Sequence, residues 1–187
     1  KLRDAPPKST APMPVVAPPI KITELPDSLW TFSYRFSSQP KDNDDDDNKD
    51  PVVLPNYAGK VTIRLLADGY SELVSQSEDS KLSIQKVWGW DEEDSREDEE
   101  KYLLFSMDVT LPKSDPLLPG QSERYYFQAR IDRKSDQIEL QEGTVTCKKD
   151  VAEKTKGRWG LFQVAGILTQ FRYVGDFIAK PAKAESS

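Results

Sequence analysis

The sequence predicts an all-β, mainly antiparallel protein whose strands form an up-and-down meander, closed into a barrel or folded as a sandwich. Apolar and polar residues alternate over several short segments, which is typical of strands with one buried face. These segments recur at a regular spacing, with turn signals between them. No segment has the pattern of a stable amphipathic helix, since the one weak candidate, residues 151–156, is too short to stand alone.

The first half of the globular region contains four predicted strands. In the first of them, LWTFSYRF, four aromatic side chains share one face. Asp68-Gly69 follows the second strand and predicts a hairpin with a type I′ turn, because that turn needs positive φ at both central residues. The strands are expected at 29–36, 61–65, 70–75 and 82–90.

The second half contains the remaining strands of an expected seven to nine. They are expected at 102–110, 124–132, 138–140, 143–147 and 166–181. The last segment is partly apolar on both faces, as expected for a strand that is covered on one side and contacts something on the other. Gly175 within it marks a bend or a bulge.

The chain divides into a proline-rich arm (1–24), one β domain (25–181) and a polar tail (182–187). Six prolines in the first twenty residues predict an extended, polyproline-like arm, which serves either as a flexible tether or as an arm laid along a partner. Two acidic loops are expected at 41–50 and 91–101, with net charges of −4 and −6. Since the whole chain carries −6, the remainder is mildly basic, at about +4.

The composition excludes several functions. The chain has no histidine, so Ser-His-Asp and Cys-His nucleophiles and the usual zinc and haem ligand sets are excluded. The acidic tract from Asp42 fails the calcium-loop pattern, which needs Gly at position 6 and Glu at position 12, where Asp47 and Val53 stand. The single cysteine, Cys147, is expected to be a small buried residue. We therefore expect no enzyme, no cofactor and no metal.

Two kinds of partner are also not expected. No apolar run is long enough for a membrane-spanning helix. A mildly basic globule with two acidic loops also argues against a nucleic-acid binder, which should show a concentrated basic face.

The strongest candidate binding segment is KKDVAEKTKGRWGLF, residues 148–162. A basic loop with large apolar side chains can dock on an acidic protein or contact a membrane surface. The alternative is a solvated loop that leads into a buried strand. The candidate partner-binding residues are Lys148, Lys149, Lys156, Arg158, Trp159 and Phe162.

A pair of tryptophans, Trp88 and Trp90, precedes the second acidic stretch. Their spacing predicts that both lie on the same side of a strand. They either pack in the core or form an exposed aromatic contact site for a partner.

The general form resembles the lipocalin and wider calycin group, with a first strand that opens on Trp30 and a late strand that carries Arg172. The resemblance implies that Trp30 closes the barrel base against Arg172, and that the protein carries a small apolar ligand. The chain departs from the family at Ser28, where the motif has Gly, and in lacking a C-terminal helix after Pro181. The residues expected to line the interior are Phe32, Tyr34, Phe105 and Phe127.

The Pro/Ala/Lys-rich opening and the segment GRWGLFQVAGILTQFRYVGDFIAKPA resemble the small stromal accessory subunits of photosystem I in diatoms and other red-lineage algae. This resemblance implies a structural subunit in the plastid stroma, peripheral to the thylakoid membrane, that binds photosystem I core subunits through its loops. The expected function is thus a non-catalytic accessory or assembly subunit of a larger complex. The alternative is a lipocalin-like carrier.

Overall fold

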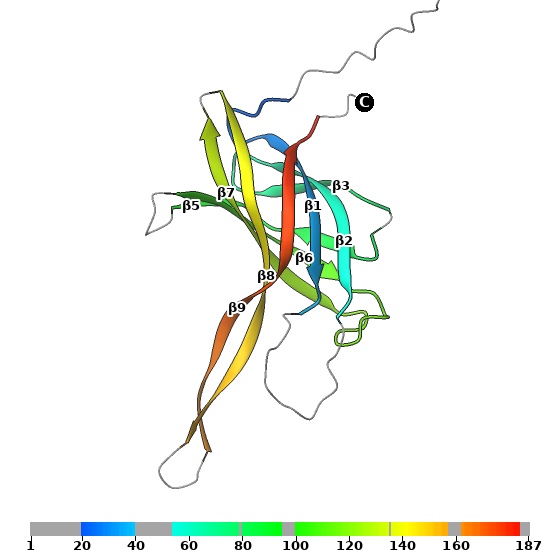
Figure 1. Cartoon of the computed structure of the whole chain (residues 1–187), viewed down its shortest axis with the longest axis vertical. Coiled ribbons are helices and arrows are strands. Elements are labelled where there is room, and N and C mark those ends of the chain that lie inside the picture. Colours follow the sequence, from blue (N-terminus) through cyan, green and yellow to red (C-terminus); the bar gives the residue numbers. More distant parts are fainter. Residues whose placement is uncertain are drawn as a thin grey trace, which may run out of the picture.

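The computed structural model describes residues 20–39, 54–78, 80–94, 100–134, 136–156 and 162–183, with the backbone alone at 150–156 and 162–169. Within these ranges the chain forms nine strands and no helix (Figure 1), so the predicted all-β class is confirmed. The strands are β1 (Ser28–Ser37), β2 (Asn56–Leu65), β3 (Ser71–Gln76), β4 (Ser83–Val87), β5 (Asp91–Asp94), β6 (Lys101–Thr110), β7 (Ser122–Lys134), β8 (Gln137–Lys156) and β9 (Phe162–Pro181).

The strands form one antiparallel sheet in the order β3-β2-β1-β9-β8-β7-β6-β4, with β5 paired to β6. Neighbours in the sheet are neighbours in the chain, except that β4 pairs with β6 and that β1 pairs with β9. The predicted up-and-down meander is therefore confirmed. The pairing of the first and last strands rolls the sheet into a nearly closed barrel rather than a sandwich.

The barrel remains open along one seam, between β3 and β4. No strand ladder joins these two strands in the described sheet. A side chain bridges them instead, because the Ile84 N–H donates a hydrogen bond to Oε1 of Gln76 at 3.1 Å.

Aromatic rings fill the interior of the barrel. The alternation in β1, β6 and β7 turns every second residue inward, and the largest of these side chains are fully buried. The ring of Phe127 lies 5.0 Å from that of Phe105, 5.5 Å from Phe177 and 6.4 Å from Phe36. Close packing of this kind is typical of a protein interior.

The β2–β3 hairpin forms as predicted, but its turn is not type I′. Gly69 has a φ of 82°, whereas Asp68 does not have a positive φ. The Gly69 N–H donates to the Leu66 carbonyl at 3.1 Å, and the Leu66 N–H donates to the Tyr70 carbonyl at 2.9 Å. This is a tight turn followed by a left-handed glycine, the arrangement common in longer hairpin loops.

Gly175 lies at a β-bulge, as the sequence predicts. Val145 pairs with Gly175 and Thr146 pairs with Tyr173, so Val174 is the extra residue on β9. Gly175 also pairs with Phe36 on the other side of β9. The bulge thus sits where β8, β9 and β1 meet.

The acidic stretch 91–101 is not entirely a loop. Asp91–Asp94 form β5 and pair with Lys101–Leu104 of β6. The Arg133 guanidinium binds the Glu92 carboxylate at 2.8 Å, which offsets part of the negative charge. Residues 95–99 and the other acidic stretch, 41–50, lie outside the described residues.

The last part of the predicted N-terminal arm packs against the barrel. Ile22 of the arm is buried in the core, as is Leu25, the first residue of the predicted β domain, and the Ile138 N–H donates to the Ile22 carbonyl at 2.6 Å. Residues 1–19 and 184–187 lie outside the described residues.

A buried carboxylate, Asp115, holds the loop between β6 and β7 against β2. It is 3% exposed and accepts hydrogen bonds from the Tyr57 hydroxyl (2.7 Å) and from the N–H groups of Leu117 (2.9 Å) and Leu118 (2.8 Å). Burial by itself raises the pKa of Asp115, but these hydrogen bonds outweigh it and hold the pKa below its ordinary value.

Asp115→Asn is expected to lower the free energy of unfolding at pH 7 by about 1.5–3 kcal/mol, because it removes hydrogen bonds to a charged acceptor. The folded-state pKa of Asp115 is depressed, so its contribution is present above about pH 4 and is lost as the pH falls through the folded value. Urea unfolding at pH 7 and pH 3 checks this, with Asp94→Asn on exposed β5 as the control. If Asp115→Asn lowered the free energy of unfolding equally at pH 7 and pH 3, the prediction would be contradicted.

Candidate docking surface

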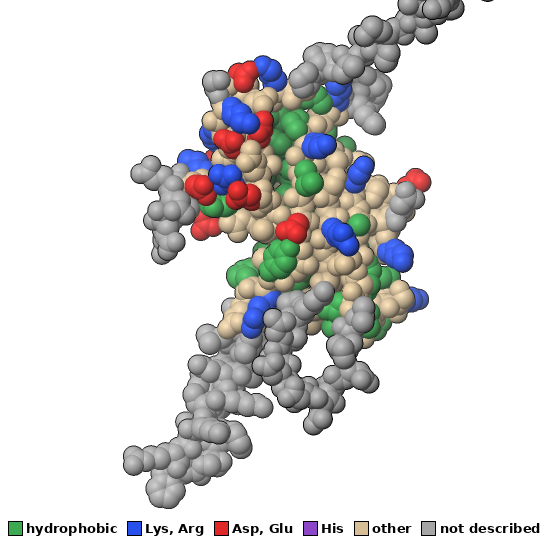
Figure 2. All heavy atoms as spheres, viewed as in Figure 1, with side chains coloured by type: hydrophobic (Ala, Val, Ile, Leu, Met, Phe, Trp, Pro, Cys, Tyr) green, Lys and Arg blue, Asp and Glu red, His purple; other side chains and the backbone are tan. Residues whose placement is uncertain are grey.

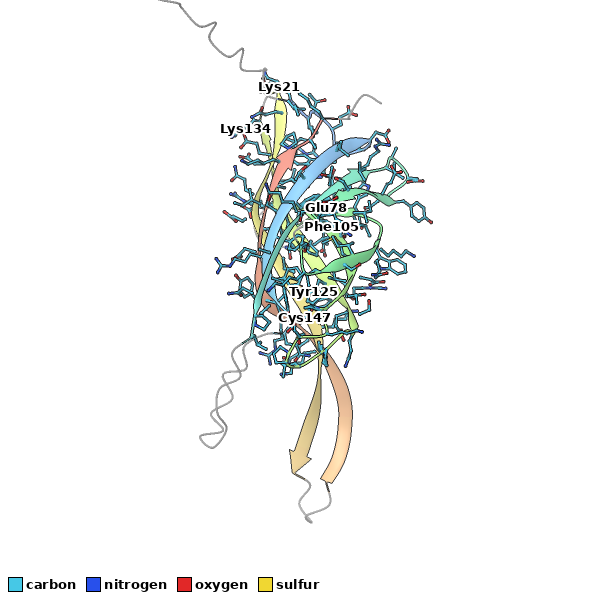
Figure 3. All side chains as sticks on the ribbon, turned by 90° about the vertical axis from the view of Figure 1, so that its right-hand side faces the viewer. Lys21, Glu78, Phe105, Tyr125, Lys134 and Cys147 are labelled. Atoms are coloured by element: carbon cyan, nitrogen blue, oxygen red, sulfur yellow. The ribbon has the colours of Figure 1, made fainter. Side chains whose placement is uncertain are left out.

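The hairpin of β8 and β9 extends beyond the barrel. Strand β8 pairs with β7 only as far as Cys147, and β9 pairs with β1 only from Gly175 onward. Within the described pairings, residues 148–156 and 162–171 therefore pair with each other alone. Figure 1 shows them as a two-stranded extension below the barrel, and Figure 3 shows the same projection from the side. We call residues 148–156 and 162–171 the ribbon.

The ribbon replaces the basic loop expected at 148–162 and the weak helix candidate at 151–156. Its register continues that of the barrel, from Lys149 opposite Gln170 to Lys156 opposite Phe162, with one irregularity between Ala152 and Lys154. The β9 half is rich in β-branched and aromatic residues, which favour an extended backbone. The charged β8 half has no such preference and forms a strand because its partner supplies the backbone hydrogen bonds.

The two halves of the ribbon hairpin differ sharply in composition. The β8 half, KKDVAEKTK, is highly charged. Residues 159–171, WGLFQVAGILTQF, contain no charged side chain over thirteen positions. A two-stranded hairpin is at best marginally stable in water, and an uncharged strand without a barrel behind it gains little from burial within the chain.

The structure separates the six predicted binding residues. Lys148 lies on the outer face, where its Nζ is 5.1 Å from the ring of Tyr126 and 5.5 Å from that of Phe171. Lys149 is half-buried on the opposite face of the same strand. Lys156 and Phe162 pair in the last backbone register described for the ribbon. Arg158 and Trp159 lie outside the described residues.

Exposed aromatic side chains surround the base of the ribbon. Phe171 and Tyr173 are each 57% exposed, and the ring of Phe171 meets that of Tyr126 edge-on at 5.0 Å. The Tyr173 hydroxyl donates to Oδ2 of Asp176 at 2.7 Å, and this hydrogen bond, together with burial, raises the pKa of Tyr173. In the sequence, this aromatic surface was indicated by the last predicted strand, 166–181, which is partly apolar on both of its faces.

The two tryptophans lie on different sides of the barrel wall, so their predicted common side is wrong. Trp88 is half-buried on the outside, where its Nε1 donates to Asp108 at 2.9 Å and Nζ of Lys86 lies 3.5 Å from its ring centre. Trp90 packs against the core, and its Nε1 donates to the Leu66 carbonyl at 2.9 Å. Residues 88–90 lie between the end of β4 and the start of β5, so the alternation of a strand does not apply to them.

The contact that the calycin resemblance implies is not formed. Trp30 lies opposite Pro181 and donates from its Nε1 to Ser28 Oγ at 2.8 Å. Arg172 lies opposite Cys147 near the far end of the barrel, and its side chain is exposed. Ser28 thus binds the tryptophan at the position where the family motif has glycine.

The described part of the chain holds neither an exposed cysteine nor a cluster of metal ligands. Cys147 is buried, and burial raises the pKa of its thiol to about 11, so the nucleophilic thiolate is scarce at neutral pH. No group of three or more potential ligands among the described side chains is placed to hold a metal ion. Nor does this part of the chain form a helix of the length and hydropathy needed to cross a membrane.

Comparison with known proteins adds no further information about the site. No protein-family model, curated protein or solved structure matches the chain. The ribbon and the aromatic side chains at its base are therefore the features from which a function is argued.

Proposed function

We propose that this chain is a non-catalytic accessory subunit that docks on a larger protein complex through the ribbon. The observation that carries the proposal is the extension of β8 and β9 beyond the barrel, where they pair with each other alone and the β9 half is uncharged. Each large apolar side chain buried against a partner would contribute about 1.5–3 kcal/mol. Docking would therefore supply the burial that the barrel does not give the ribbon.

The base of the ribbon supports the same function. Phe171 and Tyr173 are large, rigid and more than half exposed, and aromatic side chains of this kind dominate many protein interfaces. Phe171 belongs to the ribbon and Tyr173 lies two residues beyond it, so one partner surface can cover both. The proposed interface thus runs from the end of the ribbon to the outer wall of the barrel.

The barrel interior favours docking over the carrier alternative. The rings expected to line a ligand cavity, those of Phe32, Phe105 and Phe127, lie in contact with one another or with Phe177, at centroid distances of 4.8–5.6 Å. A carrier needs space in the same place.

Photosystem I is the complex that we propose as the partner, at its stromal face, with the protein in the plastid stroma. The support for this choice is the resemblance of the segment GRWGLFQVAGILTQFRYVGDFIAKPA to stromal accessory subunits. Much of this segment forms β9, including the β9 half of the ribbon.

The proposal is tested by removing the ribbon without disturbing the barrel. Asp150 and Thr169 are cross-strand partners, so residues 151–168 can be replaced by Asn-Gly, which forms a two-residue hairpin turn. The shortened protein should fold with an unchanged circular dichroism spectrum and unfolding midpoint. In a density gradient of a gently solubilised native extract, it should no longer migrate with a large complex.

A second variant preserves the ribbon and changes only its charge. K156E/R158E is expected to weaken association. If basic residues contact an acidic partner, the difference from the wild type should be largest at low salt and should shrink as salt screens the attraction. If the shortened protein migrates with the complex as the full chain does, the ribbon is not the docking element.

A further inference from the structure

One wall of the barrel carries basic side chains without ion-pair partners. This wall, the β2–β1–β9 wall, consists of the outward side chains of β2, β1 and the barrel part of β9. Arg35, Lys60 and Lys180 are exposed on it, and among the described residues no carboxylate lies within ion-pair distance of any of them. Among the described residues, these three basic side chains are thus unpaired.

The opposite side of the barrel shows that this arrangement is not general. All four basic residues of β7 bind carboxylates of neighbouring strands or of the adjoining turn. The pairs are Arg124–Asp108 (2.7 Å), Arg130–Glu100 (3.2 Å), Arg133–Glu92 (2.8 Å) and Lys134–Glu139 (2.6 Å). In Figure 2, red and blue side chains lie together over this side, whereas blue side chains stand apart over β1 and β2.

Acidic residues are scarce on the β2–β1–β9 wall. Strands β1 and β2 contain none, and β9 contains only Asp176. One oxygen of Asp176 already accepts the Tyr173 hydroxyl. Among the described residues of the wall, the exposed basic side chains of Arg35, Lys60 and Lys180 therefore outnumber the one carboxylate.

The wall is also hollowed at its junction with the ribbon. A hollow of about 480 Å³ lies beside the β9 bulge, where Gly175 has no side chain and Val174 is the extra residue. Arg35, Tyr173 and Asp176 line it, and Asp176 is the cross-strand partner of Arg35. Ile178, further along β9, is 66% exposed. The wall thus combines basic, aromatic and aliphatic contacts, as protein interfaces do.

We infer that the β2–β1–β9 wall binds an acidic surface of the partner protein, with Arg35 receiving a carboxylate side chain in the hollow. The inference rests on the proposed docking function and names the chemistry of the partner. A guanidinium binds carboxylates through paired hydrogen bonds, which suits a carboxylate held in a shaped hollow. A protein fits better than an anionic membrane, because three separate basic residues are fewer than the clusters of about 4–8 that recognise such membranes.

The test uses the full chain and a defined acidic probe, the peptide hexaglutamate. We expect the peptide to shift the backbone amide signals of ¹⁵N-labelled protein at Arg35, Lys60 and Tyr173, and to leave those of β6 and β7 unchanged. Arg35→Glu should weaken binding about tenfold or more. Lys113→Glu, which changes an exposed basic residue in the loop between β6 and β7, should bind as the wild type does.

Two results would overturn the inference. One is a set of shifts that avoids the wall, or that persists unchanged in Arg35→Glu. The other is flotation of the wild type with vesicles of 25% phosphatidylglycerol in phosphatidylcholine, lost in Arg35→Glu, with no response to hexaglutamate. The variant without residues 151–168 separates the two proposals, since it keeps the wall and should still bind the peptide even if the ribbon has no part in docking.

Discussion

Gly175→Ala is expected to destabilise the barrel by about 3 kcal/mol or more and to leave little folded protein at 37 °C. A Cβ on Gly175 would lie 2.2 Å from the carbonyl oxygen of Arg35 and 2.5 Å from Cα and Cβ of Phe36. The oxygen and Cα are backbone atoms of β1, so no side-chain rotation relieves the clash. The added methyl group would push β9 away from β1 at the pair of strands that closes the barrel.

Urea unfolding followed by circular dichroism measures this effect. Gly120→Ala is the matched control. A Cβ on Gly120 would lie no closer than 3.6 Å to another group, Cγ of Lys113, so only the φ of 68° opposes the new side chain. That strain should cost about 1–2 kcal/mol. If Gly175→Ala were no less stable than Gly120→Ala, β9 would have to approach β1 less closely than described here.

Phe127→Ala is expected to lower the free energy of unfolding by about 3–5 kcal/mol. Phe127 is 1% exposed and its ring contacts those of Phe36, Phe105 and Phe177, which come from β1, β6 and β9. Its removal would leave a cavity between strands that lie far apart in the sequence. The neighbouring rings are held by their own strands and can fill only part of it.

The comparison variant is Phe171→Ala, which removes the same side chain from the exposed base of the ribbon. Phe171 is 57% exposed, and its described ring contact is with Tyr126. We expect this variant to lower the free energy of unfolding by less than about 1 kcal/mol, because little apolar surface is buried at Phe171. Thermal and urea unfolding of both variants should show this contrast, and similar losses would mean that the interior is less tightly packed than the ring distances indicate.

The sequence predicts well those strands that have one buried face. In β1, β6 and β7 the alternation is nearly unbroken, because each second side chain enters the same aromatic core. The bulge at Gly175 was predictable for a related reason, since glycine in the middle of an apolar strand marks a place where another backbone comes close. In these strands the residues that are apolar in the sequence pattern are the ones that the fold buries.

The strands that the sequence misses are those without a buried face of their own. Asp91–Asp94 carry no apolar residue, and they form β5 because β6 offers a free edge beside them. Lys148–Lys156 likewise extend β8 because the β9 half supplies the ladder. A strand determined by its partner leaves no periodic signal in its own residues.

The candidate site was predictable in location but not in arrangement. Composition pointed to residues 148–162, yet alternation along a strand puts Lys148 and Lys149 on opposite faces, which a loop would not require. Arg35 and Lys60 gave no signal, because isolated basic residues on predicted strands are ordinary. Their significance depends on which carboxylates lie near them in space.

The open seam between β3 and β4 makes the order of the strands in the chain partly arbitrary. Every ladder of the barrel would survive a cut within residues 77–82, because no described ladder joins β3 to β4. The pairing of β1 with β9, and the hydrogen bond from the Ala182 N–H to the Leu29 carbonyl at 2.9 Å, bring the natural beginning and end of the barrel together. A circular permutant that starts at β4 and ends at β3 would thus keep the same sheet, with the seam as its new pair of termini.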